Sequence, residues 1–390
     1  MTFPTIHLRS ESKPFEARSA LTPTTAKALL DAGYSVHIEH SPVRVFDDDE
    51  FAAVGASMVP EGSWIDAPLN HLILGLKELP DGDGLIRHTH ITFHHIYKYQ
   101  AGWQHTLQRF LRGGGMLLDL EYLTETTGGK RVAAFGYHAG FAGAALALKT
   151  WSWQKTHCMP NGNEAIPLLP AVEPFPNEQA LVKETTDDIR RAVDEIHKEK
   201  LARGDEKIAQ LPKVLVMGAL GRCGSGAIDF LERAGIPSSN ISKWDIDETK
   251  AGGPFAEILY FDIFVNCIFL ADSIPPFITL EMVKEKPRNL SVIADVSCDA
   301  MSPFNPIPIY DIYTTFREPT VRILGAKSGE IEKVLDVISI DHLPTIVPRE
   351  ASEAFSKGIL PNLLKLKDWK EDRAWKDVEN KFFDAVVKIL

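Results

Sequence analysis

The feature that most constrains this chain is a glycine-rich stretch at residues 213–229, which read K-V-L-V-M-G-A-L-G-R-C-G-S-G-A-I-D. The apolar run Val214–Met217 predicts a buried strand, and the glycines after it leave little side chain where the strand turns into a helix. Backbone N–H groups of such a turn can approach a pyrophosphate, and the helix N-terminus adds partial positive charge. No Lys-Ser or Lys-Thr pair follows the glycines, which excludes a P-loop.

An acidic residue, Asp245, stands at the end of the next predicted strand. A carboxylate at this place can bind the hydroxyls of a ribose, so strand, glycine turn, helix and acid together predict a dinucleotide site. The carboxylate would repel a 2′-phosphate, and the expected cofactor is therefore NAD rather than NADP. A glycine turn with a purely structural role is the alternative.

The composition excludes several classes of partner. The chain has 390 residues, enough for two domains with sizeable cores, and its net charge of −11 leaves no basic domain for nucleic acid. No apolar run approaches the roughly 20 residues of a membrane span, and the first residues lack a signal-peptide pattern. The last residues, Lys388–Leu390, are similar to the Ser-Lys-Leu peroxisomal address but differ from it, so a peroxisomal location is the alternative to a cytoplasmic one. We expect a cytoplasmic monomer that binds small molecules and neither nucleic acid nor membrane.

Four cysteines, at positions 158, 223, 267 and 298, form neither a C-x-x-C pair nor a zinc-ligand pattern. Cys223 falls within the glycine turn and Cys267 near the end of a later predicted strand, so the two could lie close together. Two buried thiols in a reducing compartment are the simpler interpretation, and a redox-sensitive pair is the alternative.

Strand-like and helix-like patterns alternate along the whole chain, which predicts an α/β fold with parallel sheets. The strands are expected at residues 6–9, 34–39, 71–77, 91–94, 116–120, 214–217, 263–268, 291–296, 321–326 and 338–341. The helices are expected from Thr22 to Gly33, at 103–112, 135–150 and 183–210, and within 351–390. We expect two Rossmann-like domains that flank a central cleft. Residues 1–135 plus 350–390 would bind substrate, and residues 136–349 would bind NAD.

Polar residues gather at three places in the first domain, and these are Glu16 with Arg18, Lys77 with Glu78, and His94 with His95. The first pair precedes a helix and the other two follow predicted strands, where open parallel sheets bind their ligands. Each place also has a structural interpretation. The first pair could be a surface ion pair, and the second a solvated strand end. Strand alternation would point the two histidines to opposite faces, and either could be structural.

Two of these motifs, Glu16-Ala-Arg18-Ser-Ala-Leu-Thr-Pro and Gly75-Leu-Lys77-Glu78, resemble the alanine dehydrogenase and transhydrogenase superfamily. Residues 131–145, 218–229 and 338–344 more specifically resemble the fungal NAD-dependent, L-lysine-forming saccharopine dehydrogenases. The similarity covers nearly the whole chain. It implies an enzyme of lysine biosynthesis through α-aminoadipate. That enzyme would convert saccharopine, NAD and water into L-lysine, 2-oxoglutarate and NADH.

The resemblance implies Lys77 as the proton acceptor and His95 as the acid–base group. The reaction needs such groups, because a secondary amine must lose a proton, water must add to the resulting imine, and the lysine amine must then leave. The substrate carries carboxylates and amines, so both signs of charge are needed around it. The residues implied around the substrate are the clamps Arg18 and Arg131 together with Glu16, Glu78, Gln100, Glu121, Phe135, Ser297, Cys298 and Asp299.

The resemblance also implies a cofactor site, with the pyrophosphate at Gly221 and Arg222 and the adenosine ribose at Asp245. The remaining residues implied around the cofactor are Thr249 on the adenine side and Lys130, Phe269, Val296, Ile340, Asp341, His342 and Leu343. Phe269 and Cys298 depart from the family pattern, where tyrosine and alanine are familiar. We expect these two to alter contacts rather than chemistry. No metal is implied, because cationic side chains can polarise the substrate.

Two other functions stay open on the sequence alone. An alanine-dehydrogenase-like enzyme that reduces pyruvate with ammonia would share Arg18, Lys77 and a histidine. The additional acids Glu78 and Glu121 favour instead a substrate with a cationic amine tail. A non-catalytic NAD-binding protein would keep the dinucleotide fold, and Lys77 would then be incidental.

Overall fold

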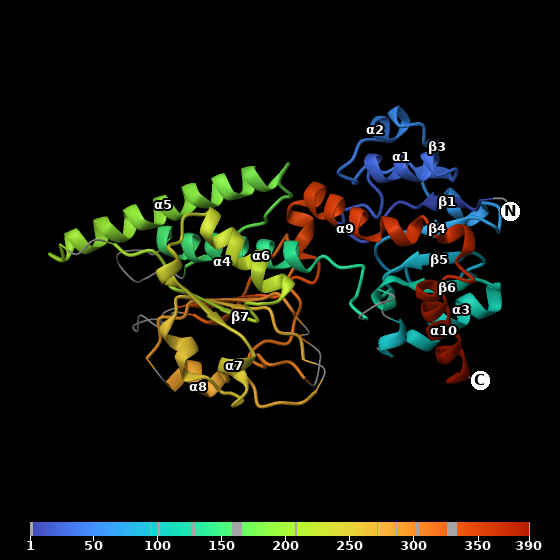
Figure 1. Ribbon diagram of the computed structural model, residues 1–390. Coiled ribbons are helices and arrows are strands. Elements are labelled where there is room, and N and C mark those ends of the chain that lie inside the picture. Colours follow the sequence, from blue (N-terminus) through green and yellow to red (C-terminus); the bar gives the residue numbers. More distant parts are fainter. Residues whose placement is uncertain are drawn as a thin grey trace. The chain divides into compact units, whose positions relative to one another are not determined.

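The computed structural model describes residues 3–94, 96–99, 102–125, 129–157, 166–206, 209–270, 272–285, 287–298, 300, 304–325 and 334–389. The chain forms two compact units (Figure 1). Unit 1 comprises Met1–Phe135 and Pro348–Leu390, and unit 2 comprises Gly136–Val347. Each unit is described by itself below.

A parallel six-stranded sheet forms the centre of unit 1, in the order β3-β2-β1-β4-β5-β6. Its strands are β1 (Thr5–Leu8), β2 (Ser35–Glu39), β3 (Ser57–Val59), β4 (Leu72–Leu74), β5 (Thr89–Thr92) and β6 (Met116–Asp119). The chain reverses its direction of travel across the sheet between β1 and β4. This order is that of a Rossmann fold, in which such a reversal marks the place where ligands bind.

Helices cover the sheet of unit 1 (Figure 1). They are α1 (Pro23–Asp31), α2 (Asp48–Ala53), α3 (Trp103–Gly113), α9 (Pro348–Leu363) and α10 (Arg373–Val387), with 3-10 turns η1 (Ser63–Asp66), η2 (Ile96–Lys98), η3 (Leu120–Tyr122) and η7 (Leu366–Asp368). A capping box starts α1, because the Thr22 and Thr25 side chains each accept the other residue's backbone N–H, at 3.3 and 2.9 Å. Its predicted start at Thr22-Pro23 is therefore confirmed.

The C-terminal segment completes the core of unit 1. Phe355, Ile359 and Trp375 are buried in the same cluster as the strand residues Ile6 and Leu8. The indole Nε1–H of Trp375 donates to the carbonyl of Asn362 at 2.9 Å, so its one polar atom is satisfied within the core. Residues separated by nearly the whole length of the chain thus share one hydrophobic core.

The sheet of unit 2 also has six strands, in the order β11-β12-β10-β9-β7-β8. They are β7 (Val214–Met217), β8 (Ile241–Trp244), β9 (Ile263–Asn266), β10 (Val292–Asp295), β11 (Val321–Leu324) and β12 (Leu335–Ile338). All pairs are parallel except the edge strand β11, which is antiparallel to β12. The α/β class with two Rossmann-like units is confirmed, with this one antiparallel strand as a refinement.

One predicted strand of unit 2 was misplaced. The pattern of residues 338–341 predicts a strand, whereas β12 ends at Ile338 and a turn follows at residues 341–342. The actual strand contains Asp336, which is buried and accepts hydrogen bonds from Arg322 Nε at 2.8 Å and Gln154 Nε2 at 2.8 Å. A buried acid interrupts the apolar pattern, and its partners lie far away in the sequence.

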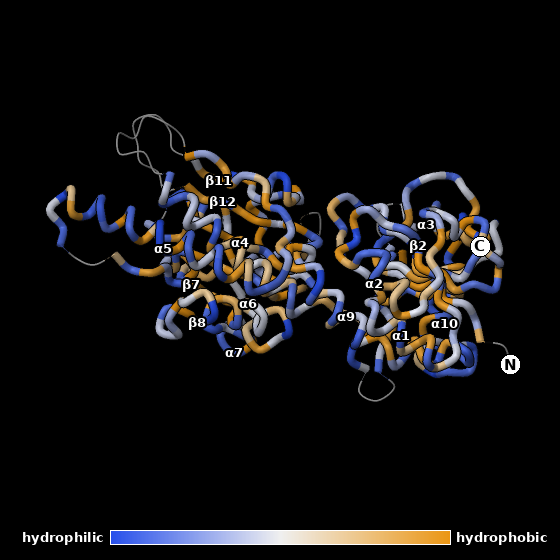
Figure 2. The backbone as a smooth tube through the Cα atoms, turned by 90° about the horizontal axis from the view of Figure 1, so that it is seen from above, coloured by the Kyte–Doolittle hydropathy of each residue, from blue (hydrophilic) through white to orange (hydrophobic). Residues whose placement is uncertain are grey.

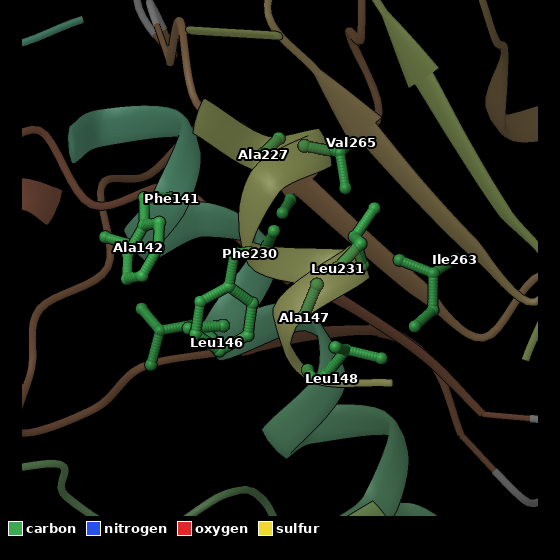
Figure 3. Packing of buried hydrophobic residues seen from close by; sticks show 14 of the residues in the cluster. Phe141, Ala142, Leu146, Ala147, Leu148, Ala227, Phe230, Leu231, Ile263 and Val265 are labelled. Atoms are coloured by element: carbon green, nitrogen blue, oxygen red, sulfur yellow. The ribbon is translucent and has the colours of Figure 1, made fainter. Parts of the chain in front are cut away.

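Two helices pack closely on the sheet of unit 2 (Figure 3). The unit's helices are α4 (Gly136–Thr156), α5 (Glu178–Ala202), α6 (Arg222–Arg233), α7 (Ile246–Thr249) and α8 (Leu280–Glu285), with η4 (Ser238–Asn240), η5 (Ala256–Tyr260) and η6 (Leu343–Ile346). Phe141 of α4 meets Phe230 of α6 edge to face at 4.8 Å between ring centroids. A Cβ on Gly140 would lie 1.7 Å from the Cys223 carbonyl oxygen, so only glycine permits this approach.

Apolar residues concentrate inside both units (Figure 2). Helix α5 buries only Leu181, Thr185, Ile189 and Ala192, and most of its remaining surface is polar. Its expected role as a solvated, charged helix is confirmed, although the helix begins five residues earlier and ends eight earlier than expected, at Glu178 and Ala202 rather than Lys183 and Gln210. Within the described ranges no helix combines the length and apolar character that crossing a bilayer requires.

Candidate functional site

The polar residues of unit 1 follow the carboxyl ends of its parallel strands. Arg9 follows β1, Lys77 follows β4, His94 follows β5 and Glu121 follows β6. Parallel strands present these ends at one edge of the sheet, which is where open α/β sheets bind ligands. The predicted groups of unit 1 therefore share an edge.

Arg18 and Glu16 form a buried ion pair, with only 3% and 1% of their surfaces exposed. Arg18 Nε and Nη2 donate to the two oxygens of Glu16 at 2.7 and 2.5 Å, and its Cζ lies 4.3 Å from the centre of the Phe135 ring. The ring stacks in turn on Phe355 at 4.3 Å. A surface ion pair, the structural interpretation of this motif, is therefore wrong. The guanidinium is fixed by an acid on one side and an aromatic face on the other.

Two residues that the sequence analysis missed, Arg9 and Glu11, hold the backbone around Lys77. The carboxylate of Glu11 accepts the N–H groups of Leu76 and Lys77 at 2.7 and 3.0 Å, and Arg9 donates to the Lys77 carbonyl. Burial raises the pKa of Glu11, while Arg9 opposes that shift. Both residues directly follow β1, so the strand-end rule could have identified them.

The side chains of Lys77 and Glu78 are half-buried. The Lys77 carbonyl accepts the Thr92 hydroxyl at 2.8 Å, and Glu78 pairs with Lys13 Nζ at 3.4 Å. The segment is thus tied to β5 and to the loop after β1. Three hydrogen bonds to its backbone, made by Glu11, Arg9 and Thr92, fix the position of Lys77 after β4.

Glu121, which follows β6, lies next to two cationic side chains. Arg131 Nη1 donates to its carboxylate, and Lys98 Nζ lies 3.3 Å from the same oxygen. The neighbouring Lys130 is exposed. One acid between two cations forms a mixed-charge group suited to a zwitterionic ligand.

The histidine pair is only partly described. Strand β5 ends at Thr92, so the strand alternation expected for His94 and His95 does not apply. His94 Nε2 accepts the Leu79 N–H at 3.4 Å, and burial lowers the pKa of its ring. The predicted site residues His95, Gln100 and Asp299 lie outside the described residues.

In unit 2 the glycine turn joins β7 to α6. Gly218 has a φ of +82°, and a Cβ on Gly224 would lie 2.2 Å from the Gly218 carbonyl oxygen. Gly221 is the N-cap of α6 and offers no side chain to occupy the first turn. Gly226 has a different role from the one expected, since a Cβ there would lie 1.9 Å from the Tyr137 carbonyl oxygen of α4. It serves helix packing, and the other glycines shape the turn.

Asp245 lies directly beside the glycine turn. One carboxylate oxygen accepts the Leu220 N–H at 2.8 Å, and the other accepts the Ile246 N–H at 2.9 Å as the cap of α7. The Thr249 hydroxyl donates a hydrogen bond to the Asp245 backbone carbonyl at 2.8 Å. An uncapped helix start with an acid at the neighbouring strand end fits the pyrophosphate and ribose of a dinucleotide.

The other predicted residues of unit 2 follow β9, β10 and β12. Phe269 is 60% exposed beyond β9, and Val296, Ser297 and Cys298 form the turn after β10. Ile340 and Leu343 are buried, Asp341 is exposed, and His342 Nδ1 lies 2.5 Å from the Asp341 carboxylate. All of them lie at the carboxyl edge, as the glycine turn does.

The described cysteines of unit 2, at positions 223, 267 and 298, are all half-buried. Burial, reinforced by Cys223, raises the pKa of Cys267 well above its ordinary value. A thiol with a raised pKa is a poor nucleophile. Cys223 and Cys267 are half-buried rather than fully buried, and the raised pKa of Cys267 disfavours a redox-sensitive pair. Cys158 lies outside the described residues.

Neither described cavity is a ready substrate pocket within one unit. A space of about 10 Å³ lies among Arg9, Glu11, Glu16 and Arg18, which is room for one water molecule. A groove of about 820 Å³ in unit 2 lies between α4, α5 and residues 169–176, and none of the predicted site residues lines it. The position of the candidate residues at the two sheet edges is a better guide to the site than cavity size.

Known proteins resemble the chain over part or all of its length. Residues 7–142 match the family of the alanine dehydrogenase/PNT N-terminal domain. An L-alanine dehydrogenase shares the fold with a TM-score of 0.60 and 16% identity, covering 97% of this chain and 99% of that chain. A transhydrogenase from Sinorhizobium meliloti does so with a TM-score of 0.55 and 16% identity, covering 95% and 97%.

Relatives of much higher identity cover nearly the full length. The saccharopine dehydrogenase [NAD(+), L-lysine-forming] of Neurospora crassa is 52% identical, covering 98% of this chain and 97% of its own. The protein of the same name from Emericella nidulans is also 52% identical, covering 98% of each chain. The one from Yarrowia lipolytica is 50% identical over the whole of both chains. The resemblance drawn from the motifs is confirmed, and the chain belongs to the family of NAD(+)-dependent, L-lysine-forming saccharopine dehydrogenases.

Proposed function

We propose that this protein converts saccharopine, NAD⁺ and water into L-lysine, 2-oxoglutarate, NADH and a proton. The observation that carries the proposal is identity of about half over nearly the whole chain with relatives named for this activity. Two sheet edges lined with suitable groups support it. The bound NAD⁺ would supply the hydride acceptor.

Unit 2 is proposed to bind the dinucleotide. The pyrophosphate would bind at the N-terminus of α6, with Gly221 and Arg222, where the dipole and backbone N–H groups favour an anion. Asp245 would bind the ribose hydroxyls of adenosine. The residues proposed around the rest of the cofactor are Thr249, Phe269, Val296, Ile340, Asp341, His342 and Leu343, with Lys130 of unit 1.

Unit 1 is proposed to bind most of the substrate. Glu16 occupies Nε and one N–H of Nη2 in Arg18, which leaves the Nη1 group to bind a substrate carboxylate. Arg131 would bind a second carboxylate beside Glu121, and Glu78 would balance an ammonium group. The further residues proposed around the substrate are Gln100, Phe135, Ser297, Cys298 and Asp299.

Lys77 and His95 are proposed to move the protons. Lys77 would accept the proton of the secondary amine so that the adjacent carbon can release its hydride. His95 would then assist addition of water to the imine and protonate the departing lysine amine. Glu11 and Arg9 position Lys77 by binding its backbone on both sides.

An assay with three mixtures tests the activity. NADH oxidation is followed with L-lysine plus 2-oxoglutarate, with pyruvate plus ammonium, and with neither. We expect turnover in the first mixture alone. Turnover with pyruvate plus ammonium would identify an alanine-dehydrogenase-like enzyme instead, and NADH binding without turnover in any mixture would identify a binding protein.

Substitution of Lys77 tests its role. Lys77→Met should lower kcat by about 10²- to 10⁴-fold, the usual value of one acid–base group, while NADH binding followed by fluorescence is retained. Lys27→Met is the control, because Lys27 is exposed and pairs with Asp31 on the surface of α1. A variant at position 77 with the kcat of the wild type would remove this lysine from the mechanism.

We further propose that the protein acts as a cytoplasmic monomer and binds no nucleic acid. Its net charge of −11 would repel a phosphate backbone. Light scattering after size exclusion gives the oligomeric state, and fluorescence of a tagged chain gives the location. A stable dimer or a punctate peroxisomal signal would contradict these proposals.

A further inference from the structure

Three histidines of unit 1 lie together on one face of its sheet. His7 in β1 and His37 in β2 are register partners, so their side chains point to the same side. His71 directly precedes β4, which pairs with β1 on its other edge, and the register places it on that side too. One ring nitrogen from each histidine lies within 4.8 Å of the other two. The ring centroids are 5.1 to 6.0 Å apart.

A buried carboxylate orients the first of these rings. Glu39 accepts His7 Nε2 at 3.1 Å and the backbone N–H groups of Ser10, Gly62 and Trp64 at 2.9, 3.0 and 2.8 Å. Three of these four partners are backbone N–H groups, which can only donate, so the carboxylate acts as the acceptor. An ionised carboxylate only accepts, so Nε2 of His7 carries the proton and Nδ1 presents its lone pair.

The lone pairs of this cluster are poorly satisfied within the described part of the protein. His7 Nδ1 and His71 Nδ1 are buried without a hydrogen-bond partner, and their residues are only 2% and 7% exposed. A buried polar nitrogen without a partner costs free energy, and a cation would remove that cost.

We propose that His7, His37 and His71 bind a divalent transition-metal cation such as Zn²⁺, with Glu39 as the group that orients His7. Imidazole nitrogen favours Zn²⁺, Ni²⁺ and Cu²⁺ over Mg²⁺ and Ca²⁺. A carboxylate that accepts the second ring N–H of a ligating histidine is the usual outer support of such sites. Water would complete the coordination, and the half-buried His37 provides the approach from solvent.

Binding would draw the cluster together. Zn–N bonds of about 2.0–2.1 Å place tetrahedral ligand nitrogens about 3.4 Å apart, so the rings would close by roughly an ångström from the present spread. The ion would then tie β1, β2 and the segment before β4 to one another. Strand β4 separates His71 from Lys77. The site would therefore stabilise the structure by joining these segments, and it takes no part in the proposed reaction.

The full chain, freed of metals with a chelator, is titrated with Zn²⁺ by calorimetry and with Co²⁺ by visible absorption. The wild type should bind one ion, and the Co²⁺ complex should show the d–d absorption bands of a site with mostly nitrogen ligands. His37→Gln and His71→Gln should each weaken the affinity at least tenfold, and Glu39→Gln about 10- to 100-fold. His105→Gln should bind as the wild type does, because His105 is exposed on α3 and pairs with Asp83.

Binding of both ions to His37→Gln and His71→Gln with wild-type affinity would overturn the proposal, as would a wild type that binds neither ion. The half-exposed His37 can be replaced with little effect on the core, and circular dichroism of the metal-free variants checks that they fold. The metal-free wild type should keep its full turnover with L-lysine and 2-oxoglutarate. Failure of the metal site is therefore distinguishable from failure of the proposed activity.

Discussion

Asp245 combines a structural and a proposed binding role in one side chain, since it caps α7 and holds the Leu220 N–H. Asp245→Ser keeps a capping oxygen but removes the charge. The affinity for NAD⁺ should fall about tenfold or more, because a hydrogen bond to a charged group contributes about 1.5–3 kcal/mol. Use of NADP⁺ relative to NAD⁺ should rise. Both are measured as kcat/KM for each cofactor.

The control for this substitution is Asp247→Ser, which removes an exposed acid two residues away that pairs with Lys250. It should leave both cofactor preferences unchanged. Equal behaviour of the two variants would show that Asp245 does not bind the ribose.

His71 makes the stability of the protein depend on pH. Burial, followed by the neighbouring histidines 37, 7 and 88, lowers its pKa from 6.5 to about 4. Between these two pH values the His71 side chain is protonated in the unfolded chain but not in the folded one. The free energy of unfolding therefore falls as the pH drops from 6.5 to 4. With a chelator present, the Tm of His71→Gln should fall less between pH 7 and pH 4.5 than the Tm of the wild type does. His105→Gln should follow the wild type, and an unchanged slope in the His71 variant would contradict the assignment.

At the scale of elements, the contact between α4 and α6 is the most sensitive in unit 2. Gly226→Ala would place a methyl group 1.9 Å from the Tyr137 carbonyl oxygen, which forces the two helices apart. Such overpacking costs about 1–3 kcal/mol. Chemical denaturation should report this loss, while Ser225→Ala on the exposed side of α6 should be nearly neutral. A Gly226 variant as stable as the wild type would show that the helices can shift without penalty.

The regular elements could be predicted where local patterns decide them. The start signal Thr22-Pro23 placed the beginning of α1 correctly, and the apolar run Val214–Met217 placed both ends of β7. The strand β12 could not be placed, because Asp336 becomes acceptable inside only through Arg322 and Gln154, which the local sequence does not reveal. The local sequence pattern therefore does not predict a strand correctly where a residue distant in the sequence neutralises a buried charge in that strand.

Only those residues of the candidate site that belong to a recognisable sequence motif could be predicted. Lys77 and Asp245 were predicted as site residues because each follows a recognisable strand within a motif. Arg9 and Glu11 were missed because they act on the backbone of another segment rather than on a ligand. The histidine cluster was missed for a related reason, since His7 and His37 lie in two different strands, His71 directly precedes a third, and they meet only through the register of the sheet.

At the scale of the whole molecule, each unit should respond to its own ligand. Hydrogen exchange should show protection by NADH around the glycine turn and α6 of unit 2. L-lysine with 2-oxoglutarate should protect the loops after β1 and β4 of unit 1. NADH at about 100 times its Kd should also stabilise the fold it binds by about 2.7 kcal/mol. NADH protection confined to unit 1 would reverse the proposed division between the units.

Unit 2 is one uninterrupted segment, whereas unit 1 needs both its early residues and Pro348–Leu390. During synthesis, at about 5–20 residues per second, Phe355 and Trp375 are made roughly 10 to 50 seconds after the first segment of unit 1, Met1–Phe135, is complete. Unit 2 can mature first. Until Phe355 and Trp375 are made, the apolar strands of the first segment lack the side chains that cover them in the folded unit, and exposed apolar surface of this kind is prone to aggregation.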